Sequence, residues 1–244
     1  MDLEGKRIVV TGCASGMGAA TVRAYVQAGA KVVGMDIADE AGQEVCADAA
    51  EGGPGEIVYV SVDVSDPVRV EAAFSEADDY LGGLDALAHP AAIHAPSKAG
   101  DVTIDEWDRM FAVNVRGTVL TNQAAYHRLK IAGGGAIINF GSISGQRAEP
   151  EAAAYSASKG TVHAWTRTAA GAWGADGVRV NAVLPAIRTP MFQASWDRAT
   201  DEERTEKFWR NIHSIALGQE YGDPDRDLGP VMVFLASDAS RFIT

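Results

Sequence analysis

A tyrosine and a lysine stand four residues apart in the stretch "AAAYSASKG", which runs from Ala152 to Gly160. On a helix this spacing puts the side chains of Tyr155 and Lys159 on one face, one turn apart. A free phenol has a pKa of about 10, and a neighbouring ammonium favours the phenolate and lowers that pKa. Such a pair can exchange a proton near neutral pH. The alternative is a surface helix with an ordinary solvated lysine, and other motifs must decide between the two.

A glycine-rich stretch, "TGCASGMG" from Thr11 to Gly18, directly follows the apolar run "RIVV". Its glycines allow a tight turn, a close approach of the backbone to a pyrophosphate and close packing of the next helix. A helix from about Gly16 would point its free N–H groups at the anion. A glycine-rich turn without a ligand is the alternative, but the position between a strand and the apolar stretch "AATVRAYVQA" favours a dinucleotide-binding loop. The loop residues predicted to contact the dinucleotide are Gly12, Ser15, Gly16, Met17 and Gly18.

Two aspartates end apolar runs further along the chain. Asp36 lies 18 residues after the last of those glycines, where a carboxylate can bind the ribose hydroxyls of an adenosine. A 2′-phosphate would meet a like charge there, and neither Ser15 nor Ile37 offers a compensating cation, so we expect NAD rather than NADP. Asp63 is a candidate acceptor for the adenine amino group, and Ile37 and Val64 are predicted to lie beside the two aspartates against the cofactor. For both aspartates the alternative is a simple cap of the following loop.

Short β-branched runs alternate with longer helical patterns along the chain. The runs are almost continuously apolar, as strands covered on both faces are, and they occupy residues 7–10, 31–36, 57–63, 84–88, 136–140 and 178–184. Helix starts are indicated by Asp66-Pro67, an N-cap followed by proline, and by capping boxes at Thr103–Glu106 and Thr200–Glu203. This alternation predicts an α/β fold with a single doubly wound (Rossmann) parallel sheet and helices on both faces. Ligands then bind at the carboxyl ends of the strands.

The composition fits one globular domain covering residues 1–244, since 47% of the residues are hydrophobic and 22% are charged. No apolar run approaches the roughly 20 residues that span a bilayer, and the N-terminus shows no signal-peptide pattern. Two cysteines, Cys13 and Cys46, provide neither a disulfide framework nor a metal quartet, so a reduced, cytoplasmic protein is expected. The net charge of −12 opposes nucleic acid and anionic membranes as partners. The five histidines lack metal-binding spacing, and no metal is expected.

The motifs together resemble the short-chain dehydrogenase/reductase family, and the resemblance covers almost the whole chain. "TGCASGMG" is similar to the family's TGxxxGxG, and "LPAIRTP" resembles its PGxxxT segment after the sixth strand. "FAVNVRG" carries Asn114 at the position of the family's helix asparagine, and "NFGSISG" carries Ser142 after the fifth strand. "YSASK" supplies Tyr155 and Lys159. Five motifs in the expected order favour this family strongly.

The resemblance implies an NAD-dependent oxidoreductase that moves a hydride between the nicotinamide and a secondary alcohol or ketone. In that enzyme Tyr155 would be the acid in reduction and the base in oxidation, and Ser142 would donate a hydrogen bond to the substrate oxygen. Lys159 would also hold the nicotinamide ribose, and Asn114 would hold a water that links Lys159 to solvent. The remaining cofactor contacts that the resemblance implies are Ala91, Pro185, Ile187 and Thr189, beside Tyr155 and Lys159 themselves.

Three places depart from the family pattern. After the fourth strand, "HPAA" from His89 to Ala92 replaces Asn-Asn-Ala-Gly, so Pro90 removes one backbone donor and an alanine replaces the glycine. Ala186 replaces glycine in "LPAIRTP", and the family normally continues into one more strand beyond "ASRFIT". His89 and His94 are expected near the cofactor, without a catalytic role.

The segment at about 190–215 corresponds to the family's mobile cover over the substrate. It is rich in aromatic residues, namely Phe192, Trp196, Phe208 and Trp209, and the alternative for each of them is core packing of an amphipathic helix. The resemblance further implies a homotetramer. The helices led by Thr103 and Tyr155 carry more apolar and small residues than a solvated helix needs, which suits docking between subunits.

Two other functions stay open. A 3-oxoacyl-carrier-protein reductase resembles this chain closely but usually prefers NADPH, and a charge of −12 gives no long-range attraction for an acidic carrier protein. A non-catalytic dinucleotide-binding sensor on the same fold is disfavoured by the presence of all four residues expected to transfer the proton. The sequence does not identify the substrate, which we expect to be a small alcohol or ketone, or the physiological direction of the reaction.

Overall fold

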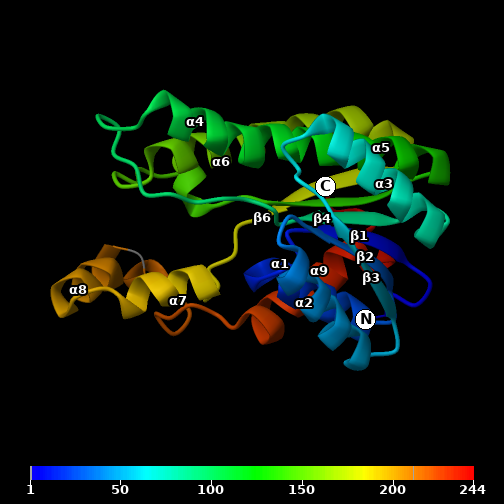
Figure 1. Cartoon of the computed structure of the whole chain (residues 1–244), viewed down its shortest axis with the longest axis horizontal. Helices are drawn as coiled ribbons and strands as arrows, with labels where there is room; N and C mark the ends of the chain where they lie inside the picture. Colours follow the sequence, from blue (N-terminus) through cyan, green and yellow to red (C-terminus); the bar gives the residue numbers. More distant parts are fainter. Residues whose placement is uncertain (1, 211) are drawn as a thin grey trace.

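A six-stranded parallel sheet forms the centre of the computed structural model, which describes residues 2–210 and 212–244 (Figure 1). Its strand order is β3-β2-β1-β4-β5-β6. The chain therefore builds one half of the sheet outward from β1 to β3 and the other half outward in the opposite direction from β4 to β6, and the two halves meet between β1 and β4. The strands are β1 (Arg7–Thr11), β2 (Lys31–Asp36), β3 (Glu56–Ser61), β4 (Ala86–His89), β5 (Gly135–Phe140) and β6 (Val178–Val183). The predicted doubly wound sheet and its six strands are confirmed.

Helices cover both faces of this sheet (Figure 1). One face carries α1 (Gly16–Gln27), α2 (Asp39–Glu51) and α9 (Gly229–Ala236). The opposite side carries α3 (Pro67–Leu81), α4 (Ile104–Phe111), α5 (Gly117–Ala132) and α6 (Ala153–Trp173). Two further helices, α7 (Pro190–Asp197) and α8 (Asp201–Arg210), project beside these layers.

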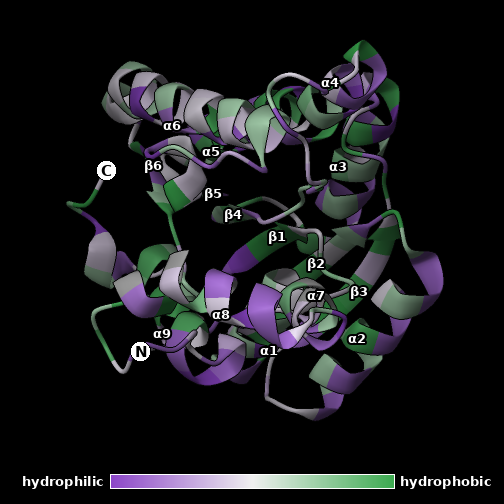
Figure 2. Ribbon diagram, turned by 90° about the vertical axis from the view of Figure 1, so that its left-hand side faces the viewer, coloured by the Kyte–Doolittle hydropathy of each residue, from purple (hydrophilic) through white to green (hydrophobic). Residues whose placement is uncertain are grey.

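The two faces have separate apolar cores, which explains why the strands read as continuous apolar runs. In β1, Ile8 and Val10 belong to the core that also holds Tyr25 of α1, whereas Val9 belongs to the core that holds Phe74 of α3. Successive side chains of a strand point to opposite faces, so both faces need apolar residues. In Figure 2 the strands are accordingly hydrophobic in colour, whereas α8 is largely hydrophilic.

The predicted helix starts are confirmed by their hydrogen bonds. The Asp66 side chain accepts from the N–H groups of Val68 and Arg69, and Pro67 occupies the first helical position. Thr103 and Glu106 form a complete capping box at the start of α4. Thr200 and Glu203 exchange two reciprocal bonds at the start of α8, with Thr200 N–H donating to the carboxylate at 2.7 Å.

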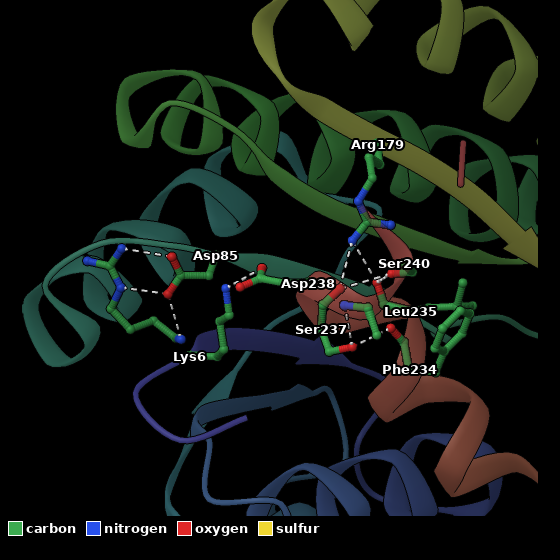
Figure 3. Close-up of polar contacts among 10 residues, drawn as sticks. Lys6, Asp85, Arg179, Phe234, Leu235, Ser237, Asp238 and Ser240 are labelled. Atoms are coloured by element: carbon green, nitrogen blue, oxygen red, sulfur yellow. Dashed lines mark hydrogen bonds and ion pairs between the residues drawn. The ribbon is translucent and has the colours of Figure 1, made fainter. Parts of the chain in front are cut away.

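Polar contacts hold the C-terminal residues against the sheet (Figure 3). Arg179 of β6 donates to the carbonyl oxygen of Leu235 at 2.9 Å and to that of Ile243 at 3.3 Å. Lys6 pairs with Asp238 at 2.8 Å (Figure 3). These bonds connect the C-terminal residues to β6 and to Lys6, which directly precedes β1. Within the described ranges, no helix is long and apolar enough to cross a bilayer, and no group of three or more histidine, cysteine or acidic residues could hold a metal ion.

Candidate active site

The glycine-rich loop forms a tight cradle between β1 and α1. Gly12 and Gly16 have φ angles of +65° and +54°, values that favour glycine. A Cβ on Gly12 would lie 2.7 Å from the Cα of Ala91, and one on Gly18 would overlap the carbonyl oxygen of Gly12. The Ser15 side chain makes no capping bond, so no side chain at the N-cap accepts from the first N–H groups of α1. This arrangement fits a pyrophosphate group.

Asp36 lies directly against this loop. Its carboxylate accepts from the N–H of Ala14 at 2.9 Å, and also from those of Ile37 and Ala38. Asp63 accepts from the N–H and the hydroxyl of Ser65. Both aspartates therefore make the loop-capping bonds named above as the alternative. A carboxylate has about four acceptor positions, so the cap of Asp36 leaves room for a hydroxyl donor as well.

The other predicted cofactor residues lie at the same edge of the sheet. Met17 is half-buried against the core of α1 and α9, Val64 is buried, and Ile37 is exposed at 68%. Thr189 caps α7 by accepting from the N–H of Phe192 at 3.2 Å. A Cβ on Gly16 would touch Pro190 at 3.6 Å and Thr189 at 3.8 Å, so the segment after β6 reaches the glycine loop. The half-buried Pro185 and Ile187 belong to that same segment.

Tyr155 and Lys159 lie in the first two turns of α6, at the carboxyl end of β5. Lys159 is only 4% exposed, its ammonium donates to the carbonyl oxygen of Phe140 at 2.7 Å, and burial lowers its pKa to about 8. Burial also raises the pKa of the Tyr155 phenol, while a hydrogen bond with Ser142 opposes that rise. The expected lowering by Lys159 is not found, because the ammonium lies 5.7 Å from the centre of the tyrosine ring and is bonded to Phe140.

Ser142 follows β5 and is held at two atoms. Its hydroxyl oxygen accepts from the N–H of Ser144 at 3.2 Å, and its own N–H donates to Nε2 of His163 at 3.2 Å. His163 was not among the residues singled out in the sequence. Its only sequence signal is its position four residues after Lys159 and eight after Tyr155, on the same face of α6.

Asn114 occupies a π-helical turn, Ala112–Arg116, that joins α4 to α5. The side chain is 1% exposed, and its oxygen accepts from the N–H of Ile93 at 2.8 Å. Its amide group donates to the carbonyl oxygen of Ile93 at 2.9 Å and to the hydroxyl of Ser158 at 3.1 Å. Both amide hydrogens are thus used within the protein. Asn114 therefore ties the segment after β4 to α6, a role that the sequence did not indicate.

The two histidines after β4 have different surroundings. His89 ends the strand, and its Nδ1 lies 2.7 Å from the hydroxyl of Thr11 and 3.1 Å from that of Thr121. Burial, with the nearby charge of Lys159, lowers its pKa to about 3. The ring of His94 lies edge-on to the ring of Tyr155, with their centres 4.7 Å apart. The departure from the family motif therefore places the His89 imidazole in the core, whereas His94, two residues beyond the departure, lies at the phenol.

The aromatic residues of segment 190–215 lie beside one another and beside Tyr221. The ring of Phe192 lies 4.5 Å from that of Tyr221 and 5.8 Å from that of Trp196. Trp209 is 61% exposed. Residue 211 of this predicted cover lies outside the described residues.

Known proteins match this chain along its length. The family model described as enoyl-(acyl carrier protein) reductase matches residues 12–244. Meso-2,3-butanediol dehydrogenase from Serratia marcescens is 36% identical over 244 residues, which cover 100% of this chain and 92% of that protein. D-threitol dehydrogenase from Mycolicibacterium smegmatis is 34% identical over 242 residues, which cover 99% of this chain and 89% of the relative.

Solved structures agree with these relatives. A short-chain type dehydrogenase/reductase from Mycobacterium marinum superposes with a TM-score of 0.89 at 31% identity, covering 100% of this chain and 92% of that one. The shared region includes the glycine loop and the whole of α6. This chain therefore belongs to the short-chain dehydrogenase/reductase family, whose members are oxidoreductases that use nicotinamide dinucleotides.

Proposed function

We propose that this protein transfers a hydride between NAD(H) and a secondary alcohol or ketone. The observation that supports this most directly is the meeting of Tyr155, Lys159 and Ser142 at the carboxyl end of β5. That end of the sheet also carries the glycine cradle, so a proton donor and a dinucleotide site share one edge. The bound dinucleotide supplies the hydride, and the protein must supply the proton.

Tyr155 supplies that proton in reduction and removes it in oxidation. Burial raises the pKa of its phenol, which keeps the proton in place until a ketone oxygen gains negative charge. The hydroxyl oxygen of Ser142 already accepts from Ser144, so its own hydrogen is directed to Tyr155 or to a substrate oxygen. Lys159 has three ammonium hydrogens. One goes to Phe140, which leaves two for the ribose hydroxyls of the nicotinamide half.

NAD is the cofactor form that Asp36 supports. The carboxylate is fixed against Ala14 of the glycine loop, where a 2′-phosphate would meet a like charge. Its neighbour Ile37 is exposed and apolar, and therefore offers that phosphate no cation.

A substrate screen tests the proposal. The panel contains short diols, cyclic alcohols, steroid alcohols and hydroxyacyl esters, each assayed with NAD and with NADP by the absorbance of the reduced nicotinamide. Turnover of one or more secondary alcohols with NAD is expected. Cofactor binding without turnover on the whole panel would contradict the proposal and favour a dinucleotide-binding sensor.

A reductase of acyl-carrier-protein thioesters is the second candidate, because the family model that matches residues 12–244 carries an acyl-carrier-protein reductase description. The net charge of −12 opposes an acidic carrier protein. Preference for NADPH together with turnover of a 3-oxoacyl thioester would move this candidate to first place.

The proposal includes a homotetramer, a cytoplasmic location and a single domain with segment 190–215 as the substrate cover. A shallow hollow between α5 and α6, lined by apolar residues that include Val115, Val119, Val162 and Trp165, suits contact with a second copy of the chain. Light scattering at micromolar concentration tests the assembly, and a monomer would contradict it.

A further inference from the structure

Three side chains lie on the face of α6 that packs at the carboxyl end of β5. Tyr155, Lys159 and His163 are spaced four residues apart, which aligns them along the helix. Lys159 donates to the carbonyl oxygen of Phe140 at 2.7 Å, and His163 accepts the N–H of Ser142 at 3.2 Å. Consecutive turns of the helix therefore hold consecutive parts of one short backbone segment.

The imidazole of His163 lies between the two glycines on either side of Ser142. A Cβ on Gly141 would come within 2.3 Å of its Nε2, and a Cβ on Gly145 within 2.9 Å of its Cε1. The ring is only 7% exposed. Glycine at both positions is thus what allows the ring to reach the backbone of Ser142, and the packed ring has little freedom to move away.

The direction of the hydrogen bond determines the state of the ring. Since a backbone N–H can only donate, Nε2 must carry its lone pair, and the ring is neutral with its hydrogen on Nδ1. Burial, followed by the charges of Lys159 and Arg167 on the same helix, lowers the pKa of His163 and favours that neutral form. The facing segment, residues 141–145, carries glycine, serine and isoleucine and contributes no charge.

We propose that His163 is a positioning residue that fixes Ser142 for proton transfer. By accepting the Ser142 N–H it sets the place of the hydroxyl that acts on the Tyr155 phenol and lowers its pKa. Without it, a backbone donor in a half-buried site would lose its partner, and the serine would be free to shift. The inference rests on the proposed oxidoreductase function, and it gives a positioning role to a residue outside the pair of Tyr155 and Lys159.

Two substitutions separate positioning from simple packing. His163→Leu keeps an apolar side chain of fair size but removes the acceptor, and kcat is expected to fall about tenfold, which corresponds to the loss of one buried hydrogen bond. His163→Gln keeps an acceptor oxygen, and its kcat is expected to recover to within about threefold of the unmodified enzyme. The dissociation constant for NADH should stay within about twofold in both variants, because the ring contacts Ser142 and not the glycine loop. His127→Leu, at an exposed histidine of α5, is the matched control and should leave kcat unchanged.

A direct readout of the ring completes the test. Nitrogen-15 NMR of the imidazoles at neutral pH should show His163 with hydrogen on Nδ1 and a lone pair on Nε2. Its pKa should lie below that of an ordinary histidine, because burial and the nearby charges oppose protonation. An active enzyme in which His163→Leu keeps full kcat, or in which the leucine and glutamine variants lose activity equally, would overturn the inference. A protonated Nε2 would also overturn it. Lack of turnover by the unmodified enzyme on every alcohol would instead contradict the proposed function.

Discussion

The face of α6 that meets β5 and the α7–α8 segment differ in how they are held. On α6, Lys159 and His163 are 4% and 7% exposed, and each bonds to a backbone atom of residues 140–142. In the α7–α8 segment the ring of Phe192 lies beside those of Trp196 and Tyr221, and Trp209 is 61% exposed. A buried, bonded face is rigid, whereas an exposed segment with few anchors opens at low cost. We infer that the first region fixes the reaction and the second selects the substrate.

Tyr155→Phe is the strongest test of the rigid region. The ring still packs, but the transferable proton is gone, so turnover should fall by about 10² to 10⁴-fold or more. NADH binding, measured by fluorescence titration, should change by less than about twofold, because the substitution removes only the hydroxyl. A variant with more than half of the original activity would show that the proton comes from elsewhere.

Substitution of Asp36 tests whether the cofactor preference is fixed by the strand ends, as the proton transfer is. The unmodified enzyme should prefer NAD over NADP by at least about a hundredfold in kcat/KM, which is roughly 3 kcal/mol. Asp36→Asn removes the charge and should narrow the preference for NAD. Its single side-chain oxygen can still accept from the amides of Ile37 and Ala38, which share one carboxylate oxygen, while the bond from Ala14 to the other oxygen is lost. Adding Ile37→Arg should narrow the preference further, since a guanidinium pairs with phosphate. Equal use of both cofactors by the unmodified enzyme would refute the role of Asp36.

Lys159→Met should separate activity from stability. Burial lowers the pKa of Lys159 to about 8, against about 10.4 in an unfolded chain. Between these values the unfolded chain binds more protons, so the stability of the unmodified protein rises as the pH increases from 8 to 10. Below pH 8 the buried ammonium of Lys159 is charged, and the full free energy needed to bury that charge lowers the stability of the protein. A methionine carries no charge and removes this destabilisation.

The methionine variant should therefore lose turnover and bind NADH more weakly. At pH 7 its free energy of unfolding should nevertheless be higher by about 1–2 kcal/mol, even after loss of the bond to Phe140, so it should unfold at a higher temperature. Thermal unfolding at pH 7 and pH 10 checks this. The advantage should shrink at pH 10. A variant that is less stable at both pH values would mean that the bond to Phe140 outweighs the burial of the charge.

Phe192→Ala is the smallest of the expected effects and addresses the cover. Loss of its packing on Tyr221 should loosen α7 and raise KM about fivefold, to an extent that differs between substrates, while kcat changes less than about twofold. Trp209→Ala, at an exposed ring of α8, is the matched control and should change KM less. If Phe192→Ala changed kcat and left every KM alone, α7 would belong with the rigid region.

The sequence by itself determined the features that depend on local geometry. Glycine spacing after β1, the alternation of apolar strands with helices, and the caps at Asp66 and Thr103 all act over a few residues. The four-residue spacing of Tyr155 and Lys159 is equally local, because a helix alone aligns them. From these local patterns the sequence predicts the fold, the family and the candidate proton donor.

Only the tertiary structure decided which atoms those side chains contact. The bond from Lys159 to Phe140 spans 19 residues, that from Ser142 to His163 spans 21, and that from Ala14 to Asp36 spans 22. No local pattern specifies such pairs, since each depends on how close a helix or a loop packs to a strand end. For the same reason the sequence did not indicate that the amide of Asn114 joins Ile93 to Ser158, and the water that the resemblance places at Asn114 stays a prediction. Residue types and spacing indicate what chemistry is available, but packing distances decide which donor meets which acceptor.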